Sequence, residues 1–352
     1  MKKKNEILKC FAFIIIGIII FQILTYILSA KFVDPPDSPS ARIKNFYNEK
    51  KNSIDVLFVG NSEGARAYSP ISIWNEYGIT SYNYGSSLQT IPMAYYKIKE
   101  CLKYQQPKII VLEANSIFEE EKSDEACRKV IDNWKFDDVK LSAINDENLP
   151  IKDKITYIFP IIKYHSRWDK LEAKDFKVLK KYYKEISYKG FPIIINKNGY
   201  NGNINYMIES EKIEKIEEID KKYIKMIVEL CKENDIKLLL NEVTTPLMWS
   251  LPKNNATKKI ADEYEIDFID CNLAQEDIKI DWTKDFHDKG GHLNIYGAEK
   301  VSNYIGKILS EKYNIPNHKN DANIADEWNA EAQRYEQHKE KVELESSSKK
   351  DK

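Results

Sequence analysis

Hydrophobic and polar residues between positions 50 and 314 follow two periods in turn, one typical of buried strands and one typical of helices. Short runs rich in Ile, Val and Leu end at glycine or polar residues, and longer stretches carry an apolar residue every three or four positions. The pattern predicts strands at 54–59, 80–84, 108–113, 236–241 and 266–270. It predicts helices at 69–77, 88–104, 220–234, 258–264 and 296–313. Strands that alternate with crossover helices predict an α/β fold, in which a parallel sheet carries helices on both faces.

Two regions depart from this alternation. Residues 116–219 are charged and aromatic with a mixed helix and loop pattern, and we interpret them as an insertion into the α/β domain. Residues 317–352 are highly charged and contain few large apolar side chains, which predicts a charged tail that is either a solvated helix or disordered. The α/β domain is therefore expected to cover residues 50–316.

Residues 10–30 contain no charged side chain and are almost wholly apolar. About 21 helical residues span roughly 31 Å, the thickness of a bilayer's hydrocarbon core. Four lysines precede this run, which favours a cytoplasmic N-terminus and an extracytoplasmic remainder. We predict a single-pass cell-membrane protein in which residues 1–30 form a cytoplasmic stub and signal-anchor. A cleaved signal peptide is the alternative, although Leu28-Ser29-Ala30 is a poor cleavage site. The proline-rich residues 31–49 are expected to be an extended linker.

Composition narrows the class of function. The 352 residues contain 54 Lys and Arg against 55 Asp and Glu, so the net charge of −1 gives no electrostatic footprint for nucleic acid. None of the five cysteines has C-x-x-C spacing, and no H-E-x-x-H motif or phosphate-binding glycine loop is present. The sequence therefore predicts neither a metal nor a cofactor.

A serine follows the first predicted strand, in Gly60-Asn61-Ser62-Glu63-Gly64. The carboxyl edge of a parallel sheet is where open α/β folds place their ligands. A serine at this position often only caps a helix. Its hydroxyl is a weak nucleophile unless a base removes its proton. The candidate function therefore depends on whether a histidine can reach Ser62.

Two histidines lie where they could reach this edge, between the last strand and the last helix. In the stretch DFHDKGGHLN, Asp288 precedes His292 by four residues, and the two glycines between them allow a tight turn. An aspartate there would orient the imidazole and stabilise the imidazolium that forms when serine loses its proton. His287 is a competing base and Asp285 a competing acid. His318 and His338 lie in the tail, where a surface role is expected, and His165 lies in the insertion.

These two motifs resemble those of the SGNH/GDSL hydrolase superfamily. FVGNSEGAR resembles its nucleophile block and DKGGHLNIYGAEKV its Asp/His block, although the aspartate stands four residues before the histidine where the family usually has three. The resemblance implies a flavodoxin-like three-layer α/β/α fold, with Ser62 as nucleophile, His292 as base and Asp288 as its acid. It also implies oxyanion donors at Gly85 and Asn115. The motif Gly60-x-Ser62-x-Gly64 also fits the α/β-hydrolase elbow, but almost no folded chain precedes it, as that fold would require.

The anchor and the insertion resemble membrane-bound, DltD-like members of the superfamily, which are associated with cell-surface O-acylation. This implies a serine acyltransferase or esterase acting on acyl groups of cell-surface polysaccharide or teichoic acid through an acyl-serine. The implied partners are the bilayer, a membrane-bound O-acyltransferase and a glycan or teichoic-acid acceptor. His165 and Arg167 in the insertion are weak candidates for substrate binding. Two alternatives remain: a plain esterase or lipase that hydrolyses small esters, and a non-catalytic surface subunit with the same fold.

Overall fold

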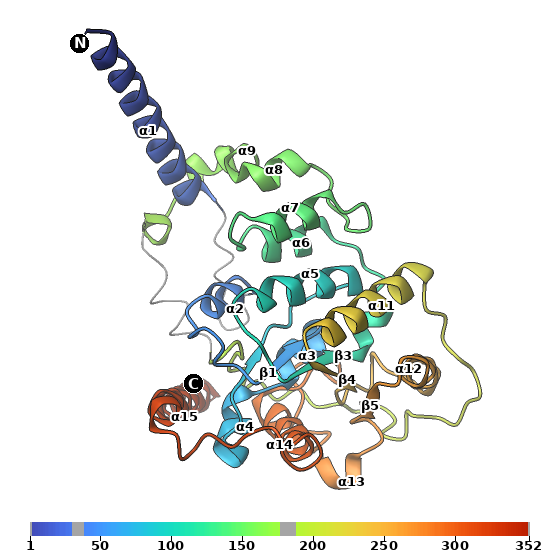
Figure 1. Ribbon diagram of the computed structural model, residues 1–352. Helices are drawn as coiled ribbons and strands as arrows, with labels where there is room; N and C mark the ends of the chain where they lie inside the picture. Colours follow the sequence, from blue (N-terminus) through green and yellow to red (C-terminus); the bar gives the residue numbers. More distant parts are fainter. Residues whose placement is uncertain (1, 30–38, 177–187, 351–352) are drawn as a thin grey trace.

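A computed structural model describes residues 2–29, 39–176 and 188–350 (Figure 1). Its centre is a five-stranded parallel sheet in the order β2-β1-β3-β4-β5. The strands are β1 (Val56–Val59), β2 (Ser81–Asn83), β3 (Ile109–Glu113), β4 (Lys237–Glu242) and β5 (Asp267–Asp270). All five lie within one or two residues of the predicted ranges. Because all the strand pairs are parallel, the carboxyl ends of the strands share one side of the molecule.

Helices cover both faces of the sheet, so the predicted three-layer α/β/α architecture is confirmed. Side chains alternate along the strands. In β1, Leu57 and Val59 pack under one helix layer, and Val56 and Phe58 pack under the other. The first layer contains α5 (Ile91–Leu102), α11 (Glu218–Glu233) and α12 (Leu251–Tyr264). The second contains α3 (Ser62–Ala67), α4 (Pro70–Tyr77), α13 (Gln275–Ile278) and α14 (Ile295–Glu311).

The region read as an insertion begins with short helices that extend the first layer. They are η1 (Ala114–Phe118), α6 (Asp124–Ile131), α7 (Asp138–Asn145), α8 (Lys154–Ile158), α9 (Pro160–Tyr164), η2 (His165–Lys170) and η3 (Ala173–Phe176). Side chains of α6 and α7, such as Val130 and Ile144, belong to the same apolar core as α5. This part of the chain is therefore built onto the sheet domain rather than standing apart from it (Figure 1).

The predicted extended linker is wrong for its second half, while residues 31–38 lie outside the described residues. Residues 39–46 form helix α2 (Pro39–Phe46), which packs against α6 and buries Ile43 and Phe46 in the first core. Arg42 is also buried, and its guanidinium donates to the carbonyls of Gly85, Ala65 and Gly190. Proline content alone suggested an extended chain, but Pro39 occupies the first helical turn, where proline is tolerated.

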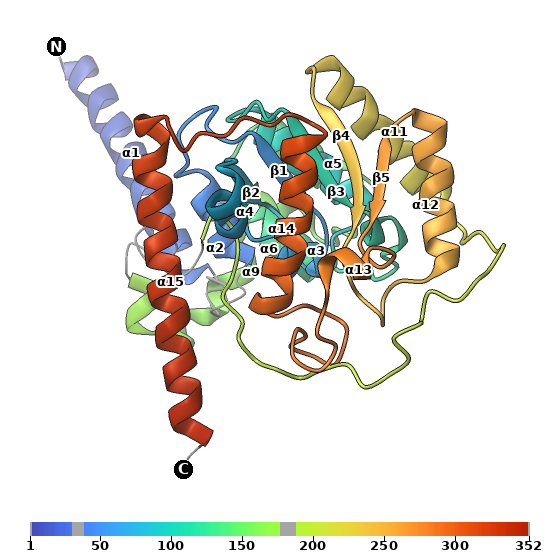
Figure 2. The same cartoon turned by 90° about the horizontal axis from the view of Figure 1, so that it is seen from below.

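The charged tail is neither disordered nor fully solvated in its first half. Residues 322–350 form helix α15 (Ala322–Lys350), which packs against α4 (Figure 2). Trp328 is 3% exposed and stacks on Trp74 at 5.2 Å between ring centroids, and Tyr335 is fully buried beside Tyr188. A few aromatic anchors, widely spaced among charged residues, are enough to dock the helix.

The apolar N-terminal segment forms helix α1 (Lys2–Leu28), which projects from the body (Figure 1). Among the described residues it is the single helix long and apolar enough to cross a membrane. Its last turns contact α9, η2 and η3.

Candidate active site

Ser62 is the first residue of α3, directly after the carboxyl end of β1. The Asn61 side chain caps this helix by accepting from the backbone N–H of Glu63. The cap therefore comes from Asn61, and the Ser62 hydroxyl remains available for chemistry. Ser62 is only half-buried, at the edge where the sheet meets the loop before α14.

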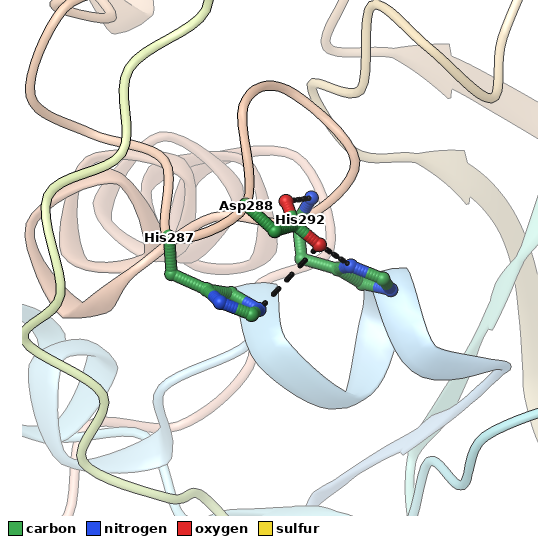
Figure 3. Close-up of side chains that lie close together, drawn as sticks. All are labelled: His287, Asp288 and His292. Carbon is green, nitrogen blue, oxygen red and sulfur yellow. Dashed lines mark hydrogen bonds and ion pairs between the residues drawn. The ribbon is translucent and has the colours of Figure 1, made fainter.

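The structure brings Ser62, His292 and Asp288 into one hydrogen-bonded chain. The Ser62 Oγ lies 2.9 Å from the His292 Nε2, and the His292 Nδ1 is hydrogen-bonded to the Asp288 Oδ2. The other carboxylate oxygen of Asp288 accepts from the backbone N–H of His292 at 2.7 Å (Figure 3). Burial opposes the charged form of Asp288, but its hydrogen bonds and the charge of His292 outweigh burial and lower its pKa to about 2. The carboxylate is thus ionised, which fixes the Nδ1–H tautomer and leaves Nε2 to accept the serine proton.

The four-residue spacing between Asp288 and His292 is accommodated by a closed loop. Phe286 and Leu293 form an antiparallel bridge at its base, and the backbone N–H of His287 donates to the carbonyl of His292. Gly290 has φ +114°, a conformation that side-chain-bearing residues rarely adopt. The extra residue is therefore absorbed in the turn, and the carboxylate still meets the ring.

The competing acid does not support His292. Asp285 is buried and paired with Lys300 at 2.7 Å, and its carboxylate also accepts from the backbone N–H of Asp281. These contacts tie Asp285 to the start of the loop and to α14. Of the two acids that the sequence left open, Asp288 is the one in contact with His292.

The competing base, His287, makes a different contact. Its Nε2 lies 2.6 Å from the Arg66 guanidinium. The same nitrogen lies 3.6 Å from the Asp288 carboxylate (Figure 3). Because a guanidinium can only donate, this nitrogen of His287 accepts. His287, Asp288 and His292 place three potential metal-ligand atoms within 4.8 Å of one another. The cation of Arg66 on His287 and the bond between Asp288 and His292 favour a hydrogen-bond relay over a metal site.

The proposed oxyanion donors differ in availability. The backbone N–H of Gly85 donates to the Asn83 side chain at 3.0 Å, so it is already engaged. The Oδ1 of Asn115 accepts from Lys253 at 2.9 Å, which fixes the orientation of the amide. Within the described parts of the chain, the Asn115 Nδ2 has no hydrogen-bond partner. Of the two donors, only Asn115 therefore keeps a free N–H in this structure.

A group of buried glutamates beneath Ser62 was not predicted. The Glu113 carboxylate accepts from the backbone N–H groups of Asn61 and Asn115 and from the Ser116 hydroxyl. It joins the loop that carries Ser62 to the loop after β3. A Cβ on Gly60 would lie 2.4 Å from the Glu113 Cβ, so the glycine is required by the close approach of this side chain. The glycine pattern was visible in sequence, but its partner, about 50 residues away, was not.

Burial raises the pKa of Glu113, and burial together with the charge of Glu113 raises that of Glu242 well above the usual value. The backbone N–H of Asn115 donates to both carboxyl groups, and two carboxyl groups that share a buried site disfavour each other's charged form. Glu63 lies next to this pair, with its Oε2 3.3 Å from the Ser62 Oγ. Burial and the charge of Glu113 raise the pKa of Glu63 to about 7, although His292 opposes the shift. The single proton of the Ser62 hydroxyl therefore has two possible acceptors, His292 and Glu63. The protonation state of Glu63 decides whether it competes with His292 for this proton.

Within the described part of the chain, the two insertion residues make their hydrogen bonds and ion pairs with residues other than Ser62, His292 and Asp288. His165 is exposed, and its Nδ1 contacts the carbonyl of Ile162. Arg167 donates to the carbonyls of Leu28 and Ser29 at the end of α1 and pairs with Asp175 at 3.2 Å. The Arg167 guanidinium is therefore engaged at the end of the apolar helix, and its proposed role in substrate binding stays a prediction.

No protein-family model matches the chain, and no curated protein matches it. Among solved structures, it is similar to a GDSL-like lipase from Bacteroides thetaiotaomicron, with 12% identity and a TM-score of 0.36 over 78% of this chain and 99% of that chain. A lipase/acylhydrolase from Enterococcus faecalis is similar over 74% of this chain and 97% of its own, with 10% identity and a TM-score of 0.36. Similarity at this level does not identify the chemistry, which rests on the geometry of the site.

Proposed function

We propose that the chain is a membrane-anchored, extracytoplasmic serine enzyme that moves acyl groups through an acyl-serine on Ser62. The observation that carries the proposal is the chain of hydrogen bonds from Ser62 through His292 to Asp288. Its order and contacts are those that serine acyl transfer requires, namely a nucleophile, a base and an oriented carboxylate. A structural serine would need neither a histidine on its hydroxyl nor an ionised aspartate behind that histidine.

In the acylation step, the Ser62 Oγ attacks the acyl carbonyl carbon while the His292 Nε2 takes its proton. The imidazolium is stabilised by the Asp288 carboxylate and then gives its proton to the leaving oxygen, whose bond to the acyl carbon breaks. In the second step His292 takes a proton from the acceptor hydroxyl, whose oxygen attacks the acyl carbon. The bond from that carbon to the Ser62 Oγ breaks, and His292 returns the proton to Oγ. The Asn115 Nδ2 is our candidate for stabilising the tetrahedral oxyanion, a contribution of about 3 kcal/mol for a well-placed donor.

The finer proposal concerns the acceptor. We propose that the acceptor is a hydroxyl of a cell-surface polysaccharide or teichoic acid, and that a membrane-bound O-acyltransferase supplies the acyl group. The support is the apolar helix α1, which would hold the site close to a donor in the membrane. Hydrolysis uses the same residues with water as the acceptor.

The nucleophile is tested with a fluorophosphonate probe on the full chain in detergent. We expect labelling of the wild type, none of Ser62→Ala, and a rate reduced by orders of magnitude in His292→Ala. Ser87→Ala is the matched control, because this serine is also half-buried and follows β2, and it should label normally. Labelling that survives in Ser62→Ala would remove the proposed nucleophile.

Transfer and hydrolysis are separated by product analysis. The full chain is given an activated acyl ester with and without a glycan or teichoic-acid acceptor, and acylated acceptor and free acid are measured by mass spectrometry. Acylated acceptor that depends on Ser62 supports transfer. Release of free acid alone, whichever acceptor is offered, would reduce the proposal to an esterase.

A further inference from the structure

A second apolar surface lies beside the apolar helix. Residues 154–176, from α8 to η3, are called the collar here. Five large hydrophobic side chains of the collar are exposed, and the exposure of Trp168 reaches 73%. The other four are Ile155, Phe159, Ile162 and Phe176. Single exposed apolar residues are ordinary, but five within one short segment mark a surface that something covers.

The collar is packed against α1. The rings of Phe159 and Phe21 meet edge to face, with centroids 6.3 Å apart. Arg167 donates to the carbonyls of Leu28 and Ser29 at 2.7 and 2.8 Å. These carbonyls lie at the C-terminal end of α1, where helices leave backbone carbonyls without an intrahelical partner. The collar therefore lies along the helix from Phe21 to Ser29, and Figure 1 shows α8 and α9 across the side of the body from which α1 projects.

The length of α1 decides what covers the collar. A spanning helix needs about 20 apolar residues, and the uncharged run begins only at Cys10. If the bilayer ended before Phe21 so that the collar stayed in water, about 11 residues, or roughly 16 Å, would remain to cross it. That is half the required thickness. The last turns of α1 must then lie in the membrane, and the collar segment packed on them must lie at least at its interface.

The composition of the collar suits that position. Trp168 is the aromatic residue type enriched at membrane interfaces, and exposed Lys154, Lys163 and Lys170 can extend their charged ends toward headgroups. The collar adjoins the exposed apolar side chains of α1, because α1 contacts α9, η2 and η3.

We propose that the collar is a second membrane-binding element, inserted into the interface of the outer leaflet and covered by lipid. This rests on the proposed anchoring by α1. It makes the body a platform fixed on the membrane by two elements rather than a domain held by a flexible tether, so the height of the Ser62 site above the bilayer is set by the fold.

The test uses the full chain with Cys10→Ser, since the other four cysteines are buried. An environment-sensitive fluorophore is placed at Ile162→Cys or Trp168→Cys. Leu344→Cys is the control, because it is also exposed and belongs to α15, a helix that Figure 1 shows apart from α1. Ile15→Cys, within α1, reports on the anchor. Each protein is reconstituted into vesicles of phosphatidylcholine and phosphatidylglycerol without other proteins.

We expect shallow nitroxide lipids to quench positions 162 and 168 several-fold more than position 344, and iodide to show the reverse order. Deep nitroxide lipids should quench position 15. If position 15 is quenched but 162 and 168 behave like 344, the collar proposal is overturned while anchoring stands, and a protein partner becomes the candidate for this surface. If position 15 is not quenched either, anchoring itself fails. Neither outcome depends on the activity of Ser62.

Discussion

At the scale of single residues, the site depends on which carboxylate holds His292. Asp288 contacts both the ring Nδ1 and the backbone N–H of His292, so one side chain sets the tautomer and the position of the base. An asparagine in its place has nearly the same shape but can present an N–H to the ring and so favour the other tautomer. The geometry would survive while the proton acceptor facing Ser62 is lost.

We therefore expect Asp288→Asn to slow acylation of Ser62 by about three to four orders of magnitude. The measurement is the rate of fluorophosphonate labelling under single-turnover conditions. Asp285→Asn is the matched control. It weakens the pair with Lys300 and should lower stability, but it should leave the labelling rate within a few-fold of wild type. The opposite order would make Asp285 the functional acid.

The raised pKa of Glu63 makes the stability of the folded chain depend on pH. Burial and the charge of Glu113 raise its pKa in the folded chain from 4.5 to about 7. The folded state then holds this proton more tightly than the unfolded state does. The stability linked to it is complete below about pH 4.5 and is lost as the pH rises through 7. At pH 8 the folded chain carries a buried charge that costs at most about 3 kcal/mol.

Glu63→Gln cannot ionise, so it should be more stable than wild type at pH 8 and similar to it at pH 5. The thermal unfolding midpoint of the full chain in detergent at the two pH values measures this. Glu233→Gln, at an exposed position, should leave the wild-type pH dependence unchanged. If wild type and Glu63→Gln keep the same difference at both pH values, Glu63 is not the titrating group.

At the scale of elements, α15 shows how few contacts can fix a charged helix. Trp328 stacks on Trp74, whose ring nitrogen donates to Asn329 at 3.0 Å. We expect Trp328→Ala to lower the free energy of unfolding by about 3–5 kcal/mol, because it removes a large buried ring and leaves a cavity against α4. Chemical denaturation of the full chain in detergent measures the loss.

Leu344→Ala on the same helix is the control for this prediction. Leu344 is 72% exposed, so its loss should change the free energy of unfolding by less than about 0.5 kcal/mol. Equal and small effects of the two substitutions would mean that α15 does not dock through Trp328.

The sequence predicted well those elements in which consecutive residues are apolar and buried. The strand at Ile109–Glu113 is buried along its whole length, so its apolar run is unambiguous. Helix α2 and the docking of α15 were missed, because both depend on isolated residues, Phe46 in α2 and Trp328 and Tyr335 in α15. Such anchors carry no period, and their partners lie far away in sequence.

The same reasoning applies to the site. Ser62, His292 and Asp288 could be picked out because each stands at a predicted turn beside a sheet edge. Glu113 and Glu242 could not, because they end strands in the way many polar residues do. Their role follows only from the register that places Glu113 beside Asn241 and beneath Gly60. The hydrogen bonds of Arg167 to the end of α1 likewise depend on how α9 and η2 pack against α1, which the sequence does not show.

At the scale of the whole molecule, the proposed anchoring requires that α1 is kept. In the folded chain the Arg167 guanidinium is bound to the carbonyls of Leu28 and Ser29, beside the position in Leu28-Ser29-Ala30 where a signal peptidase would cut. We expect an N-terminal epitope tag to remain on a full-length chain of 41.2 kDa plus tag in the membrane fraction. Loss of the tag with a shorter chain would show cleavage. An unrelated secretory protein that is cleaved and carries the same tag is the control.

Orientation is the last consequence of the same arrangement. The lysines in the first turns of α1, before the uncharged run, favour a cytoplasmic N-terminus, and we therefore expect the sheet domain and Ser62 on the outer side. In the Cys10→Ser background, a membrane-impermeant maleimide added to intact cells should label Leu344→Cys. It should label Lys3→Cys only after the cells are permeabilised. Both positions are exposed, so accessibility within the protein does not separate them, and only the membrane does. Labelling of Lys3→Cys in intact cells, with protection of Leu344→Cys, would place Ser62 in the cytoplasm and exclude an acceptor on the cell surface.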